Sequence, residues 1–222
     1  MPDAAGVRGA LVAMAGGNSP ETKLWLIRHP EPEVEPGTCY GSLDLKLSPR
    51  GLEHASEIAG ALASEPFAAI YTSPLERCRR MAEILASGRT CPVEPVGALR
   101  EMDLGECEGC QYEDLAERYP DIFREWLERP ASVRFPGGET FLELRERALS
   151  ALREVLAQHA GQTVAMVTHA GPVRAILADT LGIAPDHIFR LGQRYGGVSM
   201  IRYLGEAPIV ELMNAGYSHL IH

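Results

Sequence analysis

Short apolar segments typical of buried strands alternate along this 222-residue chain with longer segments of helical periodicity. The strand-like segments are 23–29 (KLWLIRH), 67–73 (FAAIYTS), 93–96 (VEPV), 163–169 (TVAMVTH), 196–204 (GGVSMIRYL) and 208–214 (PIVELMN). Strands separated by helices favour βαβ units, and hence a sheet whose strands are mostly parallel and buried on both faces. The sequence therefore predicts a three-layer α/β sandwich with a mostly parallel central sheet flanked by helices.

Two of the predicted helices begin at Ser-Pro pairs, Ser48-Pro49 and Ser73-Pro74. Serine is a good helix cap, and proline is well tolerated at the first helical position. The other predicted helices cover 111–129 with a break at Pro120, 138–159 without a break, and the stretch that begins at Ala170. Each predicted helix thus follows or precedes a predicted strand, as the sandwich requires.

The chain contains no internal repeat and no low-complexity linker that would divide it. We expect one domain over residues 21–214, with a cap-like insertion around 102–137. Residues 1–20 are expected to form a flexible leader, and 215–222 a short C-terminal tail.

The net charge of −9 argues against a nucleic-acid partner, because binding to phosphate backbones depends on basic patches. A local cluster of arginines can still attract a small anion into one cleft. No apolar run approaches the roughly 20 residues that cross a bilayer, so we expect no membrane association. The odd number of cysteines, five, fits a reducing compartment, and we expect a cytoplasmic protein. Cys107 and Cys110 form an isolated C-x-x-C that we interpret as incidental thiols, not as a metal site.

Polar side chains gather where the predicted strands end, which is where open α/β sheets bind their ligands. The first strand ends at Arg28-His29, and the strand at 163–168 is followed by His169. Arg77 lies one turn into the helix after the second strand, and Glu101 follows the third. Each of these residues alone would be interpreted as an ordinary polar terminus or surface group. Together they indicate one site at one edge of the sheet.

The chemistry that suits this set is phosphoryl transfer. Arg28 and Arg77 offer the planar donors that a phosphate dianion prefers. The amides of Ala170 and Gly171, at the start of a helix, are expected to add further donors. A neutral imidazole can attack phosphorus, and a carboxylic acid can protonate the leaving alkoxide. The remaining histidines are interpreted as structural or solvent-exposed: His54, His159, His187, His219 and His222.

These residues lie in motifs that resemble the histidine phosphatase superfamily, in its phosphoglycerate-mutase-like branch. The motifs are LIRHPEPE, SPLERCRRMAEIL, LREMDLGECEG and VTHAGPVR, in this order along the chain. The resemblance implies a phosphoglycerate-mutase-like fold, His29 as the phosphorylated nucleophile and Glu101 as the proton donor, with Asp103 as an alternative donor. It implies a phosphate pocket formed by Arg28, Arg77, His169 and Ala170, and it implies no metal and no organic cofactor.

The motifs depart from the family pattern at two positions. Pro30 replaces the usual glycine after the nucleophile, which removes a backbone donor and stiffens the loop. Glu35 stands where many members have asparagine. Because a carboxylate beside a phosphate would be repulsive, we expect Glu35 to point away or to make no contact with the phosphate.

The segments CYGSLDLKLSPRG and RFPGGETFLELRER resemble those of bacterial alpha-ribazole phosphatases, which act late in cobalamin assembly. Residues 102–137 are mostly acidic and aromatic, which disfavours a bisphosphate or carboxylate-bearing substrate and favours a phosphatase over a mutase. The expected partner is a small phosphorylated metabolite, with alpha-ribazole 5'-phosphate first and sugar phosphates or a broad range of phosphomonoesters next. A mutase, a silent phospho-ligand binder and a protein phosphatase remain alternatives, and a homodimer is left open.

Overall fold

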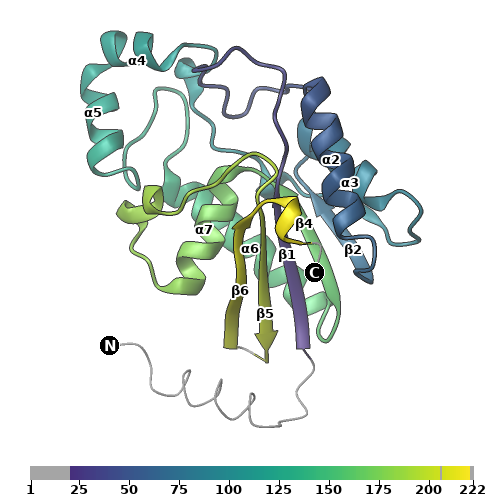
Figure 1. Cartoon of the computed structure of the whole chain (residues 1–222). Coiled ribbons are helices and arrows are strands. Elements are labelled where there is room, and N and C mark those ends of the chain that lie inside the picture. The colour runs from purple at the N-terminus through teal and green to yellow at the C-terminus, as the bar shows by residue number, and fades with distance from the viewer. Residues whose placement is uncertain (1–20, 206, 221–222) are drawn as a thin grey trace.

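A sheet of six strands forms the centre of the computed structural model, which describes residues 21–205 and 207–220 (Figure 1). The expected leader at 1–20 lies outside the described residues. The strands are β1 (Glu21–Arg28), β2 (Phe67–Thr72), β3 (Val93–Pro95), β4 (Thr163–Thr168), β5 (Val198–Leu204) and β6 (Ala207–Ala215). Their spatial order is β3-β2-β4-β1-β5-β6, so β4 lies between β1 (which ends at Arg28) and β2 (which ends at Thr72), although it begins only at Thr163.

The strands that form the site are parallel. β4 pairs in parallel with β1 and with β2, and β2 pairs in parallel with β3, whereas β5 and β6 are antiparallel additions at one edge. The predicted α/β sandwich with a mostly parallel sheet is confirmed. In the β1–β4 ladder Arg28 is the register partner of Thr168. The next residues, His29 and His169, therefore leave the sheet side by side.

Helices cover both faces of the sheet, α2 and α3 on one side and α6 and α7 on the other (Figure 1). The bounds are α2 (Pro49–Ala61), α3 (Glu76–Ala86), α4 (Tyr112–Arg118), α5 (Pro120–Glu128), α6 (Phe141–Gln158) and α7 (Ala170–Leu181). Short 3₁₀ turns include η1 (Gly97–Leu99) and η3 (Pro185–Arg190). The break predicted at Pro120 is found between α4 and α5, which lie near the carboxyl ends of the parallel strands.

The helix starts show which sequence signals were reliable. Ser48 caps α2 as predicted, because its Oγ accepts a hydrogen bond from the Gly51 amide at 3.0 Å. The predicted start at Ser73-Pro74 is wrong, since α3 begins at Glu76 without a side-chain cap. The Ser73 hydroxyl instead lies 2.8 Å from Nε2 of His169. A serine that the sequence offers as a cap therefore contacts a candidate site histidine.

The long helix α6 begins at Phe141, not at Gly138, because a capping box fixes its start. Thr140 accepts a hydrogen bond from the Glu143 amide, and the Glu143 carboxylate accepts one from the Thr140 amide. The sequence ETFLE contains this signal, which the expected boundary did not use.

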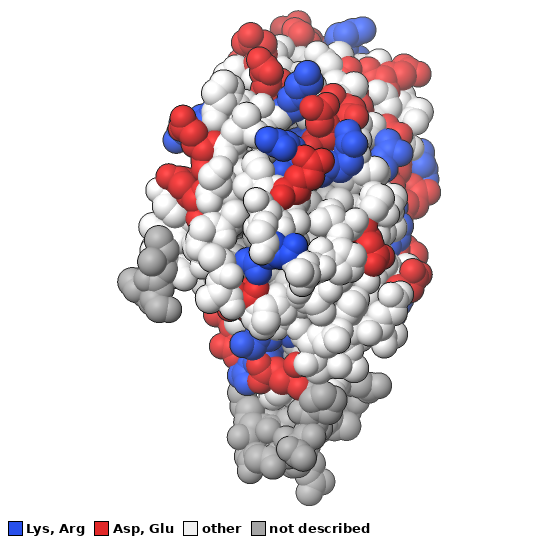
Figure 2. Space-filling view, turned by 90° about the vertical axis from the view of Figure 1, so that its right-hand side faces the viewer, with Lys and Arg blue, Asp and Glu red and all other residues white. Residues whose placement is uncertain are grey.

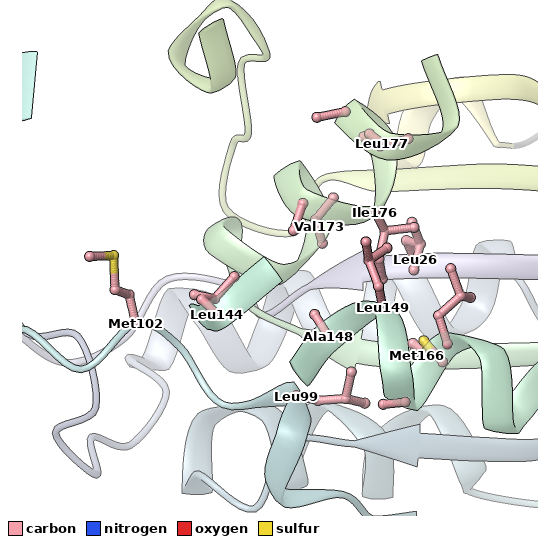
Figure 3. Packing of buried hydrophobic residues seen from close by; sticks show 14 of the residues in the cluster. Leu26, Leu99, Met102, Leu144, Ala148, Leu149, Met166, Val173, Ile176 and Leu177 are labelled. Atoms are coloured by element: carbon pink, nitrogen blue, oxygen red, sulfur yellow. The ribbon is translucent and has the colours of Figure 1, made fainter. Parts of the chain in front are cut away.

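Alternate residues of the central strands pack on opposite faces of the sheet. Leu26 of β1 and Met166 of β4 face α6 and α7, where they join Leu149 and Ile176 (Figure 3). The next residue of β1, Ile27, belongs to the second core, which α2 and α3 cover. Burial on both faces holds the carboxyl ends of β1 and β4 in fixed positions.

On the side of the molecule that carries α2 and α3, basic and acidic side chains are interspersed over the upper half, above a large uncharged area (Figure 2). This side therefore presents no field of one sign. Among the described residues, no helix is both long and apolar enough to span a membrane.

Candidate active site

His29 is the first residue beyond β1 and is 1% exposed. Its amide donates to the Thr168 carbonyl at 2.9 Å, which continues the β1–β4 ladder by one residue. Its ring Nδ1 lies 2.7 Å from the Pro30 carbonyl oxygen. Because a carbonyl only accepts, this contact assigns the ring proton to Nδ1. Nε2 is then the unprotonated nitrogen, and it accepts a hydrogen bond from Arg77.

The environment of His29 keeps its ring neutral. Burial is the main cause that lowers the pKa of His29 well below its ordinary value, and the positive charges of Arg77 and Arg28 lower it further. The hydrogen bond to Pro30 acts in the opposite direction and is the weaker influence. The imidazole is therefore neutral at pH 7.

Arg77 projects from the first turn of α3 and is fully buried. Its Nε donates to Nε2 of His29 at 3.2 Å. Its two terminal nitrogens donate to the carbonyls of Leu43 and Gly41 at 2.6 and 2.7 Å. These bonds fix the guanidinium plane, yet within the described residues no carboxylate pairs with it. A buried cation held in this way is suited to an anionic ligand.

Arg28, the last residue of β1, forms the second cation of the site. It donates to the Gln193 carbonyl at 2.5 Å, and its guanidinium carbon lies 4.2 Å from the ring centroid of Tyr195. The hydroxyls of Tyr195 and Tyr40 are 2.9 Å apart, and Tyr40 also accepts from Arg28 at 3.4 Å. The two tyrosines thus hold the guanidinium at the cavity wall. Sequence reasoning missed both, since neither follows a strand or sits in a charged motif.

His169 meets His29 because β4 lies beside β1. The ring centroids are 5.1 Å apart in an edge-to-face arrangement, and His169 is fully buried. Burial, followed by the charge of Arg77, lowers the pKa of His169 well below its ordinary value. Its Nε2 lies 2.8 Å from the Ser73 hydroxyl. The sequence analysis predicted both histidines as site residues, and the structure places their rings side by side.

Glu101 is half-buried in the cavity wall, and its Oε1 accepts from the amides of Met102 and Gly171 at 2.9 and 3.1 Å. The expectation that the Gly171 amide serves the phosphate is therefore wrong, since that amide orients Glu101. Ala170 does line the cavity, as the first residue of α7. The Asp103 carboxylate instead accepts from the Gly105 amide at 2.8 Å and lies outside the cavity wall. The geometry favours Glu101 over Asp103 as proton donor.

Arg147 of α6 holds the backbone of this segment, a role that the sequence did not reveal. It donates to the carbonyls of Arg100 and Glu101 at 2.6 and 3.1 Å. The same guanidinium pairs with Glu139 at 2.5 Å, and both side chains are largely buried. Since Glu139 also accepts from the Asp103 amide at 3.0 Å, α6 fixes the backbone on both sides of the candidate acid.

A cavity of about 530 Å³, a size typical of small-molecule sites, is lined by Arg28, Glu101 and Ala170. The buried side chains of His29, Arg77 and His169 lie behind this wall and do not line it. The outer walls of the cavity are mainly apolar and aromatic: Val34, Pro36, Tyr112, Trp126, Phe141, Ile188 and Phe189. Trp126 stacks on Tyr112 with ring centroids 5.9 Å apart and meets Phe189 edge to face at 5.6 Å. Residues of α4, α5 and η3 therefore form an aromatic part of the cavity wall.

The structure also places the two departures from the family motifs. The hydrogen bond to the His29 ring uses the backbone carbonyl of Pro30, which a glycine would also supply. Glu35 is exposed in the cavity wall. No hydrogen bond joins it to Arg28 or Arg77 within the described residues.

Neither the other described histidines nor the cysteines line the cavity. His159 hydrogen-bonds Tyr71 and Gln162, His54 is half-buried, and His187 and His219 are exposed. His222 lies outside the described residues. All five cysteines carry free thiols. In residues 21–205 and 207–220, no group of three or more His, Cys, Asp and Glu side chains is placed to hold a metal ion.

Comparison with known proteins supports the same interpretation. A model of the histidine phosphatase superfamily (branch 1) matches residues 24–216. The chain is 36% identical over 193 residues to phosphoserine phosphatase 1 of Hydrogenobacter thermophilus, covering 86% of this chain and 92% of that one. The structure of YhfR from Bacillus stearothermophilus is similar with a TM-score of 0.82 and 29% identity, over 86% of this chain and 96% of that one. A putative alpha-ribazole-5'-P phosphatase from Escherichia coli gives a TM-score of 0.80 and 25% identity, over 87% and 96%.

Proposed function

The chain belongs to the histidine phosphatase superfamily (branch 1) and is a phosphatase, and we propose that it hydrolyses small phosphomonoesters through a phosphohistidine at His29. The observation that carries the proposal is the state of the His29 ring. Its proton is on Nδ1, which donates a hydrogen bond to the Pro30 carbonyl. Nε2 lies 3.2 Å from Nε of the buried Arg77. An unprotonated ring nitrogen beside an anion-binding cation is the arrangement that nucleophilic attack on a phosphate dianion requires.

In the first step Nε2 of His29 attacks phosphorus, and the bond from phosphorus to the ester oxygen breaks. Arg28, Arg77 and His169 surround the phosphoryl oxygens and stabilise the charge on them. Protonated Glu101 gives its proton to the departing alkoxide, which leaves as an alcohol. The phosphoryl group is then bound to Nε2.

In the second step a water molecule attacks phosphorus of the phosphohistidine. The Glu101 carboxylate, formed in the first step, takes a proton from this water. The bond between phosphorus and Nε2 breaks, inorganic phosphate leaves, and His29 returns to its neutral form. The two steps need no group beyond side chains of this chain and water.

Two candidate substrates are favoured by different observations. The aromatic walls of the cavity suit the benzimidazole base of alpha-ribazole 5'-phosphate, and the E. coli neighbour is named for that activity. Phosphoserine is favoured by the relative of 36% identity, which is named as a phosphoserine phosphatase. We keep alpha-ribazole 5'-phosphate as the first named candidate and phosphoserine as the second.

The test is phosphate release from p-nitrophenyl phosphate in the presence of a chelator, with His29→Ala as the comparison. Activity that survives the chelator and is lost in the variant supports the proposal, as does an acid-labile phosphoenzyme in rapid-quench samples. Equal activity in both proteins would overturn the role of His29. Transfer of the phosphoryl group to a second hydroxyl, with little free phosphate, would indicate a mutase instead.

A further inference from the structure

Arg174 is the second arginine of the cavity wall, beside Arg28. It lies on α7 four residues after Ala170, so both face the same cavity. Its Nε donates to the Leu191 carbonyl at 3.0 Å, and its guanidinium carbon lies 5.6 Å from the Phe189 ring centroid. These contacts hold the stem and Nε but leave both terminal amino groups without a hydrogen-bond partner in the described residues.

Burial lowers the pKa of Arg174, and the negative charge of Glu101 offsets part of this effect from beyond ion-pair distance. No carboxylate of the described residues lies within salt-bridge distance of it. The carboxylates that share the cavity wall are Glu31, Glu35 and Glu101. Glu31 accepts from the Ser48 hydroxyl at 3.1 Å, and Glu101 is held by backbone amides. Burying a cation without its partner is unfavourable. A ligand that brings its own anion removes this cost.

Position separates Arg174 from Arg77. Arg77 hydrogen-bonds His29 and, like it, is buried behind the cavity wall, whereas Arg174 is part of that wall and lies against Phe189. A phosphoryl group at Nε2 of His29 therefore places the leaving group, not the phosphate, near Arg174. The planar guanidinium with two free amino groups suits a carboxylate, which it can bind in a bidentate manner.

We propose that Arg174 selects phosphomonoesters whose leaving group carries a carboxylate a few bonds from the ester oxygen. This inference rests on the proposed function and makes its substrate class narrower. The composition of residues 102–137 led to the expectation that the site disfavours carboxylates, but Arg174 lies outside that segment, on α7. A carboxylate-binding Arg174 favours phosphoserine-like substrates over alpha-ribazole 5'-phosphate, which has no carboxylate.

The experiment compares two substrates that differ in one group. O-Phosphoethanolamine has the skeleton of O-phosphoserine without the carboxylate. We would measure kcat/KM for both with the full chain, with Arg174→Gln and with Arg174→Lys, which keeps the charge. Arg190→Gln is the matched control, because Arg190 is an exposed arginine at the end of η3 and lies outside the cavity wall. p-Nitrophenyl phosphate, which has no carboxylate, reports the basal phosphatase activity.

We expect the native chain to prefer phosphoserine by about tenfold to a hundredfold, the value of one charged hydrogen-bonded contact. Arg174→Gln should bring the ratio close to one, mainly through KM, whereas Arg174→Lys should keep part of it. Arg190→Gln should retain the native ratio. The activity toward p-nitrophenyl phosphate should change little in all of them.

Three outcomes would overturn the role of Arg174. The native chain could treat both substrates alike, Arg174→Gln could keep the preference, or the variant could lose activity toward all substrates in proportion. The last result would indicate that Arg174 only supports the Leu191 backbone. Absence of activity toward p-nitrophenyl phosphate in the native chain would instead contradict the proposed function.

A binding measurement tests Arg174 without turnover. 2-Amino-4-phosphonobutyrate and 3-aminopropylphosphonate are non-hydrolysable analogues of the same two substrates. By calorimetry, the native chain should bind the carboxylate-bearing analogue more tightly, and Arg174→Gln should abolish the difference. Arg174→Met, which keeps the apolar stem, provides a second variant if Arg174→Gln unfolds. Equal affinities in the native chain would contradict the proposal.

Discussion

Nε of Arg77 donates a hydrogen bond of 3.2 Å to Nε2 of His29, and both side chains are almost completely buried. The cation therefore contacts the nitrogen that we propose is phosphorylated and, through its terminal nitrogens, the loop carbonyls of Gly41 and Leu43. One guanidinium thus holds the ring of the candidate nucleophile and the loop in a single rigid arrangement. This preorganisation means that little has to move when the charge of the transition state develops.

Replacing Arg77 by Met should lower kcat by about a hundredfold to a thousandfold, the effect of losing one preorganised donor. Arg77→Lys should recover little, because an ammonium cannot reach His29 and two carbonyls at once. Steady-state kinetics with p-nitrophenyl phosphate measure the effect. Arg80→Met is the control, since Arg80 is exposed on the same helix and pairs with Glu83. A kcat of Arg77→Met close to the native value would contradict the assignment.

The effect of Glu101→Gln on kcat should depend on the leaving group of the substrate. An alkyl phosphate needs a proton donor, so its kcat should fall by about a hundredfold to ten-thousandfold. p-Nitrophenolate leaves readily without a proton, and formation of the phosphoenzyme from its phosphate should fall much less. A burst of p-nitrophenol in stopped-flow traces would show this directly. Glu106→Gln, an exposed neighbour, should behave as the native chain. Equal losses with both substrates would show that Glu101 is not the acid.

The free energy of unfolding should decrease as the pH is lowered, over a range set by the two buried histidines. The pKa values of His29 and His169 are both lowered by burial and by nearby arginines, so the folded state binds fewer protons than the unfolded state. The contribution of the two neutral, buried histidines to the free energy of unfolding is complete above the unfolded-state pKa of about 6.5. It is lost progressively as the pH falls below that value. Each histidine then contributes a slope of up to about 1.4 kcal/mol per pH unit.

Urea unfolding between pH 7.5 and 5, above the range where ordinary carboxylates titrate, measures this slope. His169→Asn should reduce it by about half. His187→Asn should leave it unchanged, because that side chain is exposed in η3. A slope that is the same in the native chain and in His169→Asn would show that His169 is not buried in its neutral form.

The capping box of α6 should contribute to stability but not to catalysis. Thr140→Ala removes the hydroxyl that accepts from the Glu143 amide, and the free energy of unfolding should fall by about 1 kcal/mol. Thr140→Ser keeps the hydroxyl and should be close to the native chain. Neither change should alter kcat, since Thr140 lies outside the cavity wall. A large loss of kcat in Thr140→Ala would indicate that α6 positions Glu101 through its first turn.

Much of the site could be predicted from the sequence because residue types and short-range hydrophobic patterns can be identified without the tertiary structure. Arg28-His29 and His169 follow apolar segments that form β1 and β4, and Arg77 lies at the start of α3. Hydrophobic runs, prolines and helix caps determine the ends of strands and helices through interactions between residues close in sequence. The sequence therefore places these side chains at strand ends. The spacing of Ala170 and Arg174 on one helix face was equally readable, although the sequence interpretation did not use it.

The contacts between these residues depended on pairings across the chain. The insertion of β4 between β1 and β2 brings His169 to 5.1 Å from His29. It also leaves Ser73 to bind His169 instead of capping α3, and α6 brings Arg147 to the backbone of Glu101. Tyr195, more than 160 residues from Arg28, covers it by the same long-range packing. Strand order and cavity walls arise from the free energy of burying both faces of the sheet, which is a property of the whole chain and not of any local pattern.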